Sequence, residues 1–451
     1  MTMSKLRRSS SILTGVSLTM LLAACGGGGD GGSTASSGTP TATQCASNGT
    51  CPASGPIRNG AAPGPLCPAA LDYSTTFTGG SGAGELIRLR FDTQAHTYQL
   101  EIIESPVPKQ TGSISPTRAG VTFSGTFANL TTLPTAEQNR CAVALQSANA
   151  SDSTSQALID PSHPPVIFLG NGVAGGGIPG ATISYGGILG IGAIPSTTFP
   201  IYPVLAFAQT ETDFGKVAGT WNVLGYHQVP SGGSLTAQSH FTPATAQTTE
   251  TLNADGSCTA TGSSCVTTGN SWKLRTQNDG AFESSNADGS RRYPSFYSQA
   301  ITNNNNSRAK GVLVVGKLNG ALIPLLIRVG YANVASIFSI NVDDESGLAL
   351  LAPNARLASA QIIGGYIGSG SDLAYTASLV YDNHVDLLDP MTMNLTGSYQ
   401  LDFTQNVPGM VTTTDNSGTG GALIANGRVF AHLAGTGGSN PTFRVSVLAS
   451  P

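Results

Sequence analysis

The chain has 451 residues, enough for two or three folded cores rather than a single average domain. Only 10% of its residues are charged, against about 25% in ordinary soluble proteins, and the formal net charge is −4. No basic cluster is present, so nucleic acid is not expected as a partner, because Lys and Arg side chains are what hold it.

The first 24 residues have the layout of a cleavable signal peptide. Lys5, Arg7 and Arg8 are positive, a short apolar run extends over residues 12–22, and small residues precede Cys25. The apolar run is about half of the roughly 20 residues that a membrane-spanning helix needs, which disfavours an uncleaved anchor. The sequence therefore predicts export.

The tetrapeptide Leu22-Ala23-Ala24-Cys25 resembles the lipobox of bacterial lipoproteins. The resemblance implies cleavage before Cys25, a diacylglycerol on its sulfur and acylation of its amine. Two or three acyl chains hold a protein firmly on a bilayer, so the lipid bilayer is the expected partner. Gly26 stands where lipoproteins kept in the inner membrane typically carry aspartate, which favours the outer membrane. The glycine tract after the cysteine also makes the chain similar to large lipoproteins of Gram-negative proteobacteria. This resemblance does not point to any particular activity.

Residues 25–66 are predicted to be the lipidated cysteine and a flexible linker. Gly, Ser, Thr, Ala and Pro dominate this segment, and it has too little apolar surface to offset the entropy of ordering. We expect a disordered tether that lifts the folded part off the lipid head groups.

Six cysteines besides Cys25 favour disulfides in an exported chain. Fifteen pairings are open. Loop length suggests Cys45 with Cys51, Cys258 with Cys265 and, by elimination, Cys67 with Cys141. A zinc site is disfavoured because paired C-x-x-C elements are lacking.

Beyond the tether, apolar residues recur with a period of two, which indicates half-buried strands. Leu86 to Phe91 is one example, with Arg88 and Arg90 on the opposite face, and Asn-Gly, Asp-Gly and Gly-Gly pairs mark hairpin turns between such runs. The best helix candidate is Thr135 to Ala148. We expect an all-β protein of two or three antiparallel, hairpin-rich lobes, small barrels or sandwiches, over residues 67–203, 204–346 and 347–451.

A weak internal repeat supports several lobes, because residues 219–223 match residues 397–401. Hairpins containing proline are expected over residues 312–329 and 429–447, with a third over 166–183 turning at Gly175 to Gly177. The Gly219-Thr220-Trp221 triplet is similar to the Gly-x-Trp of lipocalins. That resemblance implies an apolar ligand beside Trp221, whereas a tryptophan that merely plugs a barrel needs no ligand.

No common catalytic or cofactor motif is present, including the Gly-x-Ser-x-Gly elbow, the phosphate-binding loop and H-E-x-x-H. No catalytic residue and no cofactor is therefore expected. Asp382, His384 and Asp386 alternate, and a strand would project all three to one side as candidate metal ligands. The solvated face of an edge strand is the preferred interpretation, so no metal is expected.

Three functions remain open from the sequence. The first is a membrane-anchored envelope lipoprotein with a non-enzymatic binding or structural role, whose protein or ligand partner the sequence does not identify. The second is an envelope or extracellular hydrolase of glycan or ester that uses two scattered carboxylates. The third is a lipocalin-like carrier of a small apolar ligand.

Overall fold

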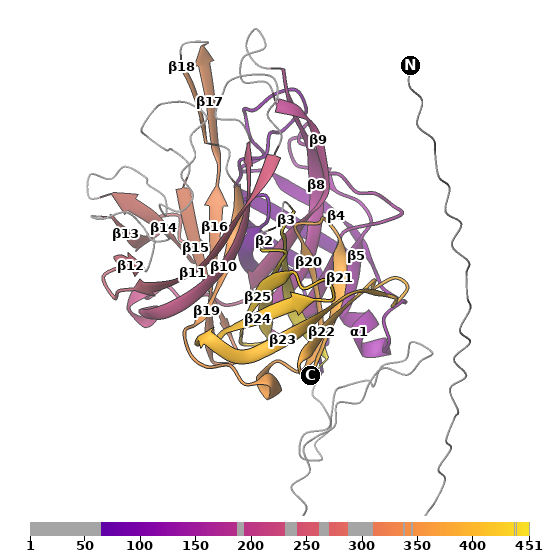
Figure 1. The fold of residues 1–451 in the computed structure, drawn as a ribbon. Coiled ribbons are helices and arrows are strands. Elements are labelled where there is room, and N and C mark those ends of the chain that lie inside the picture. Colours follow the sequence, from indigo (N-terminus) through magenta and orange to yellow (C-terminus); the bar gives the residue numbers. More distant parts are fainter. Residues whose placement is uncertain are drawn as a thin grey trace, which may run out of the picture. The chain divides into compact units, whose positions relative to one another are not determined.

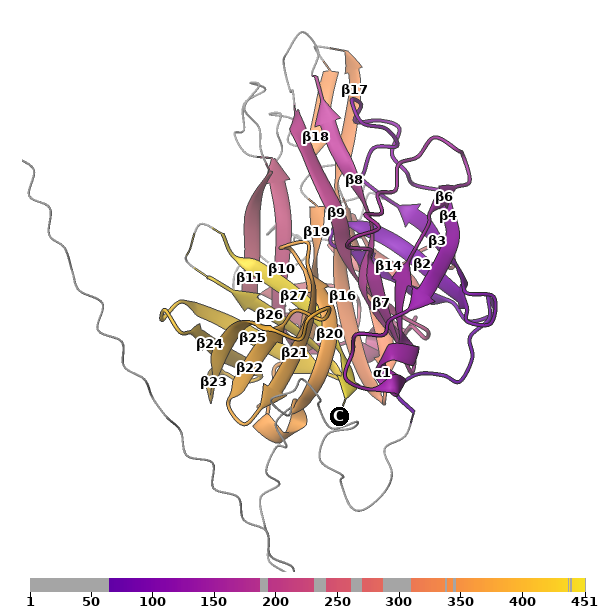
Figure 2. The ribbon, with the colours of Figure 1, turned by 90° about the vertical axis from the view of Figure 1, so that its right-hand side faces the viewer.

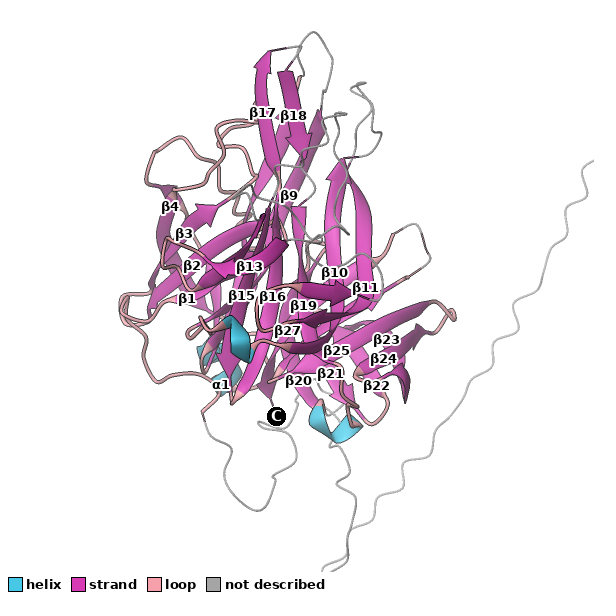
Figure 3. Ribbon diagram, turned by 90° about the vertical axis from the view of Figure 1, so that its left-hand side faces the viewer, coloured by secondary structure: helices cyan, strands magenta, loops and turns pink. Residues whose placement is uncertain are grey.

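The computed structural model describes residues 65–186, 194–230, 241–260, 270–286, 310–336, 339–343, 346–436, 438 and 440–450. Most of this part of the chain is strand (Figure 3), and every strand pairing is antiparallel apart from one isolated bridge. The expected all-β class, with antiparallel barrels, is confirmed. The predicted signal peptide, Cys25 and almost all of the predicted tether lie outside the described residues.

The first sheet closes into a barrel. Its order is β3-β2-β1-β9-β8-β7-β5-β4-β6, and β3 also pairs with β4, so eight strands form a ring to which β6 is attached. We call this ring the first barrel. Its elements are β1 (Phe77–Ser81), β2 (Glu85–Asp92), β3 (Thr97–Glu104), β4 (Thr122–Asn129), α1 (Ala136–Cys141), β5 (Ala142–Leu145), β6 (Asn149–Ala150), β7 (Val166–Gly170), β8 (Val173–Tyr185) and β9 (Ile194–Phe207).

The second sheet, here the middle sheet, has eight strands in the order β12-β11-β10-β19-β16-β15-β14-β13 (Figure 1). Near its two edges the Trp272 backbone N–H donates to the Gly256 carbonyl at 2.8 Å, so the sheet is almost closed. Its strands are β10 (Gly219–Pro230), β11 (Phe241–Leu252), β12 (Cys258–Ala260), β13 (Asn270–Leu274), β14 (Ala281–Asn286), β15 (Lys310–Leu318), β16 (Ala321–Val329) and β19 (Ser346–Pro353), with β17 (Tyr331–Ser336) and β18 (Ser339–Asp343) as a separate hairpin.

The third sheet is a closed barrel in which β20 to β27 follow one another in sequence order, and we call it the C-terminal barrel (Figure 2). Such an up-and-down arrangement needs only short hairpin connections. Its strands are β20 (Gly364–Gly370), β21 (Tyr375–Tyr381), β22 (His384–Leu388), β23 (Leu395–Val407), β24 (Met410–Asp415), β25 (Gly420–Asn426), β26 (Val429–Ala434) and β27 (Thr442–Ser450). The predicted lobe boundaries stay predictions.

Three local expectations need correction. The helix expected over Thr135 to Ala148 ends at Cys141, because residues 142–145 are buried on both faces as strand β5. The third hairpin turns at Asn171-Gly172, whereas Gly175 to Gly177 lie inside β8. The repeat between residues 219–223 and 397–401 joins strands that are not equivalent, since β10 is the first strand of the middle sheet and β23 is the fourth of its barrel.

A different repeat is present in the structure. The Trp221 indole N–H donates to the Val217 carbonyl at 3.0 Å, and the Tyr366 hydroxyl donates to the Ile362 carbonyl at 3.0 Å, four residues back in each case. A short 3-10 helix precedes each aromatic residue, over Phe214–Lys216 and Ser359–Gln361. The middle sheet and the C-terminal barrel therefore open in the same way.

The three sheets share one apolar core built from their outer faces. Phe207 of the first barrel, Ile327 of the middle sheet and Val447 of the C-terminal barrel belong to the same cluster. Close packing requires glycine at the contacts, because a Cβ on Gly175 would lie 2.5 Å from Val447 and one on Gly316 only 2.3 Å from the Phe207 ring. Strands such as β16 and β26 are consequently buried on both faces.

Polar contacts also join the sheets. Arg275, 2% exposed, donates to Asp279 at 2.7 Å, to Glu283 at 3.0 Å and to Glu104 of β3 at 2.8 Å, so one guanidinium ties the middle sheet to the first barrel. The Asn222 side-chain amide donates to the Pro408 carbonyl at 2.7 Å, which ties the middle sheet to the C-terminal barrel.

An ion pair lies inside the first barrel. Arg118 and Glu85 side chains are both fully buried and are joined by two hydrogen bonds of 2.7 Å, while Ser81 and Ser105 donate to the same carboxylate. Burial alone would lower the pKa of Arg118, and the Glu85 carboxylate overrides that effect and raises it. Such a pair is stable only while both partners remain.

Glu85→Gln is expected to lower the free energy of unfolding by about 3 to 5 kcal/mol, because it leaves a buried guanidinium charge without its counter-ion. Urea denaturation measures this change. The double variant Glu85→Gln with Arg118→Met should recover much of the loss, and a double variant as unstable as the single one would contradict this account.

Candidate binding site in the C-terminal barrel

The three candidate metal ligands, Asp382, His384 and Asp386, do not all lie on one strand. Strand β22 begins at His384, so His384 and Asp386 share a face, whereas Asp382 lies in the preceding turn with φ of 47°. The expected single strand through all three residues is therefore wrong. Both Asp386 oxygens already accept, from Tyr381 at 2.8 Å and from Ser398 at 2.6 Å. The expectation that no metal binds at these residues stays a prediction.

Trp221 is 7% exposed and belongs to the middle sheet's own apolar cluster, together with Phe214, Val217 and Trp272. Its one hydrogen-bond donor is used by the Val217 carbonyl. An apolar ligand beside this indole stays a prediction.

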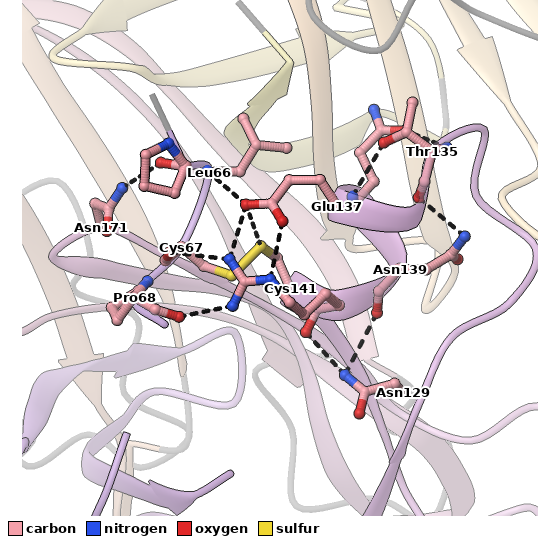
Figure 4. Close-up of a disulfide and its surroundings, with 12 residues drawn as sticks. Leu66, Cys67, Pro68, Asn129, Thr135, Glu137, Asn139, Cys141 and Asn171 are labelled. Atoms are coloured by element: carbon pink, nitrogen blue, oxygen red, sulfur yellow. Dashed lines mark hydrogen bonds and ion pairs between the residues drawn. A yellow bond between two sulfur atoms is a disulfide. The ribbon is translucent and has the colours of Figure 1, made fainter. Parts of the chain in front are cut away.

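The Cys67–Cys141 disulfide fastens the start of the first barrel to α1 (Figure 4). Glu137 accepts from the Leu66 backbone N–H at 3.0 Å, and Arg140 donates to the Pro68 carbonyl at 2.8 Å. The two sulfurs and the Glu137 carboxylate lie within 4.8 Å of one another, but the sulfurs are bonded to each other and are not thiolate ligands. This bridge indicates a protein that folds outside the reducing cytosol.

The other two predicted cysteine pairs, Cys45 with Cys51 and Cys258 with Cys265, stay predictions. Cys258 is disulfide-bonded, while Cys45, Cys51 and Cys265 lie outside the described residues. No helix in the described ranges combines the length and apolar character needed to cross a bilayer.

A group of polar side chains lines the inside of the C-terminal barrel. We call Ser378, Thr413, His432, Arg444 and Ser446 the polar cluster. Residues that are paired across neighbouring strands point to the same side of a sheet. Ser378, Thr413 and Ser446 are paired with Tyr366, Leu401 and Phe430, respectively, and these three partners belong to the apolar core inside the barrel. His432 pairs with Arg444 across β26 and β27. Five residues from four strands thus converge on one interior.

Four atoms of the polar cluster are buried without a hydrogen-bond partner among the described residues. They are Ser378 Oγ, His432 Nδ1, Arg444 Nε and Ser446 Oγ. Each of the four residues is at most 9% exposed. A buried polar group left unpaired costs about 1 to 3 kcal/mol, and native proteins rarely leave several together. This concentration makes the interior a candidate site for a polar ligand.

The polar cluster carries little net charge. Arg444 pairs with Asp372, and its Nη1 donates to Thr442 at 3.2 Å. Burial, and then the nearby Arg444 charge, lower the pKa of His432 to about 3, so this imidazole is neutral near pH 7. Its Nε2 lies 3.0 Å from Thr413 Oγ1, and the Tyr399 ring packs edge-on at 4.7 Å between centroids.

Inside the first barrel, by contrast, most of the buried polar atoms have hydrogen-bond partners. Its Arg118 charge is satisfied by Glu85 and by the Gln156 carbonyl at 3.3 Å, and its two serine hydroxyls donate to Glu85. The buried Tyr202 hydroxyl is without a hydrogen-bond partner in the part of the chain that the structure describes. The first barrel is therefore largely self-satisfied, and the C-terminal barrel is the better candidate for binding.

The sequence pattern around Arg444 and Ser446 would have placed these two residues of the polar cluster on the outer face of the barrel. Residues 442–447 alternate polar and apolar, a pattern usually assigned to an apolar inner and a polar solvent face. In the structure Phe443, Val445 and Val447 face the shared core outside the barrel, so Arg444 and Ser446 face inward.

Fold and site together define a multi-barrel β protein with a polar interior in its last barrel. The chain belongs to the family described as "Protein of unknown function (DUF2957)", whose family model matches residues 97–447. That range runs from β3 to β27 and so includes strands of all three sheets. No curated protein matches the chain.

Two solved structures of Transferrin Binding Protein B, a vaccine antigen from Haemophilus parasuis, are among the structural matches. A double mutant is 11% identical, with 81% of this chain and 65% of that chain covered and a TM-score of 0.17. A single mutant is 12% identical, with 80% and 64% covered and a TM-score of 0.16. This chain thus spans less than two thirds of their length.

His432→Gln is expected to flatten the dependence of stability on pH. The imidazole pKa is about 3 when folded and near 6.5 in an unfolded chain, so the unfolded state binds an extra proton between these values. Stability therefore rises with pH across this window, by up to about 1.4 kcal/mol per unit, and is lost as pH falls toward 3. Unfolding free energies of both proteins from pH 4 to 6.5 test this, and parallel curves would contradict it.

Replacing Cys67 and Cys141 by serine is expected to lower the free energy of unfolding. The bridged residues are 74 positions apart, and the chain-entropy description assigns about 4 kcal/mol to a loop of that length. Denaturation midpoints measure the change, with Arg140→Met as a control that keeps the bridge. An unchanged midpoint in the double serine variant would show that the bridge adds no stability.

Proposed function

We propose that this protein is a non-enzymatic binding lipoprotein of the bacterial envelope, held on the outer membrane through acylated Cys25. In this proposal the C-terminal barrel receives a small polar ligand. The single observation that supports the binding role most strongly is the convergence, on one barrel interior, of four buried polar atoms that have no hydrogen-bond partner among the described residues.

Several features favour a polar ligand over the alternatives. An apolar guest would leave Arg444 Nε and His432 Nδ1 without partners, whereas a polar guest supplies them. Three carboxylates do gather in the structure, those of Glu104, Asp279 and Glu283, but all of them accept from the Arg275 guanidinium, which disfavours them as a pair for hydrolysis. Binding is therefore the function best supported by the geometry.

The location proposal has its own support. The lipobox-like segment at Cys25, the low-complexity stretch after it and the Cys67–Cys141 bridge all suit an exported, anchored protein. Mass analysis of the amino-terminal peptide from native membranes should find acylated Cys25, and Cys25→Ser should release the protein from membranes. An unmodified sulfur would overturn the anchoring.

Binding is tested with the full mature protein, purified from membranes in detergent, in a thermal-shift screen. The panel contains neutral sugars, polyols, amino acids and small carboxylates. A ligand present at 100 times its Kd stabilises the folded state by about 2.7 kcal/mol, which raises the melting temperature measurably.

Two variants assign a positive result to the polar cluster. Ser446→Ala should reduce the ligand-induced shift, while the ligand-free protein keeps or gains stability because a buried hydroxyl without a partner among the described residues has been removed. Thr412→Ala, on the exposed outer face of strand β24, should leave the shift unchanged. A panel without any shift, or shifts that are as large in Ser446→Ala as in the unaltered protein, would overturn the binding role of this barrel.

A further inference from the structure

We infer that the ligand of the polar cluster is a neutral, polyhydroxylated molecule no larger than a monosaccharide. This inference rests on the proposed binding role of the C-terminal barrel and narrows it to one chemical class. Four independent features of the barrel interior point to that class.

The first feature is charge balance. Arg444 is already paired with Asp372, and His432 is uncharged at neutral pH, so the interior offers no unbalanced charge. A carboxylate or an ammonium group entering this site would be buried without a counter-ion, which is strongly unfavourable. A neutral guest avoids that penalty.

The second feature is the hydrogen-bonding character of the unpartnered atoms. Arg444 Nε can only donate, whereas the hydroxyls of Ser378 and Ser446 can donate or accept, and His432 Nδ1 does one or the other according to its tautomer. Hydroxyl groups on a ligand have the same dual character. A donor-only cation matches fewer of these atoms, because Arg444 Nε cannot accept a hydrogen bond. An anion is disfavoured by the charge balance described above and not by its hydrogen-bonding character.

The third feature is the aromatic surface next to the polar cluster. The Tyr399 ring packs against His432, and Tyr366 and Phe430 pack against each other at 4.7 Å between centroids in the same interior. Polar atoms beside aromatic rings suit a sugar or polyol, which has a hydroxyl rim and apolar C–H faces.

The fourth feature is size and access. An eight-stranded barrel has an interior just wide enough for side chains or for one small ligand, which limits the guest to about a single sugar ring. The Arg444 and Asp372 side chains are 11% and 27% exposed, so the polar cluster reaches solvent at the β20–β21 turn. That turn is the expected entrance.

The test is isothermal titration of the full mature protein in detergent with glucose, galactose, N-acetylglucosamine, myo-inositol and glycerol, and separately with acetate and inorganic phosphate. At least one neutral compound should bind, with an affinity that does not change between low and high salt because no net charge is exchanged. Ser378→Ala and Ser446→Ala should each weaken binding by about threefold to tenfold. Thr412→Ala is the matched control and should bind normally.

The outcomes separate this inference from the proposed function. Acetate or phosphate binding that falls in Ser446→Ala and weakens with salt would overturn the neutral class while leaving the barrel a binding site. Binding of a neutral compound that is unaffected by both serine variants would overturn the placement in the polar cluster. The absence of binding by every probe, together with the absence of any shift in the broader screen, would overturn both proposals.

Discussion

The shared apolar core is the constraint on which the rest of this structure depends. Three antiparallel sheets pack their outer faces together, so strands such as β16 and β26 have no face in water. Two-sided burial leaves few positions for charged side chains, which accounts for a chain that is only 10% charged. It also explains glycine at Gly175 and Gly316, where any side chain would collide with a neighbouring sheet.

The same constraint shapes the C-terminal barrel. Because the outer faces of β26 and β27 contribute apolar side chains to the shared core, their alternate residues must point into the barrel. Those residues include His432, Arg444 and Ser446, and the interior is therefore polar in one part and aromatic in another.

The buried charges of the protein divide by role. Arg118 pairs with Glu85 inside the first barrel, and Arg275 holds carboxylates from two sheets, so both cations are fully engaged in keeping the frame together. Arg444 differs because one of its nitrogens has no partner among the described residues. A frame joined by a common core and by Arg275 would hold the polar cluster in a fixed geometry, which suits a preorganised binding site.

Sequence alone determined the all-β class and some of the strands, such as Leu86 to Phe91 within β2, because a period of two in hydrophobicity and turn-forming Asn-Gly pairs are local properties. It also suggested the pairing of Cys67 with Cys141. It did not determine that helix formation stops at Cys141, that Asp382 lies in a turn, or that Tyr366 repeats the role of Trp221. Above all, alternation over residues 442–447 showed two faces but not which one enters the barrel. Only the tertiary structure decided this, because the inner face is set by what the neighbouring sheets cover.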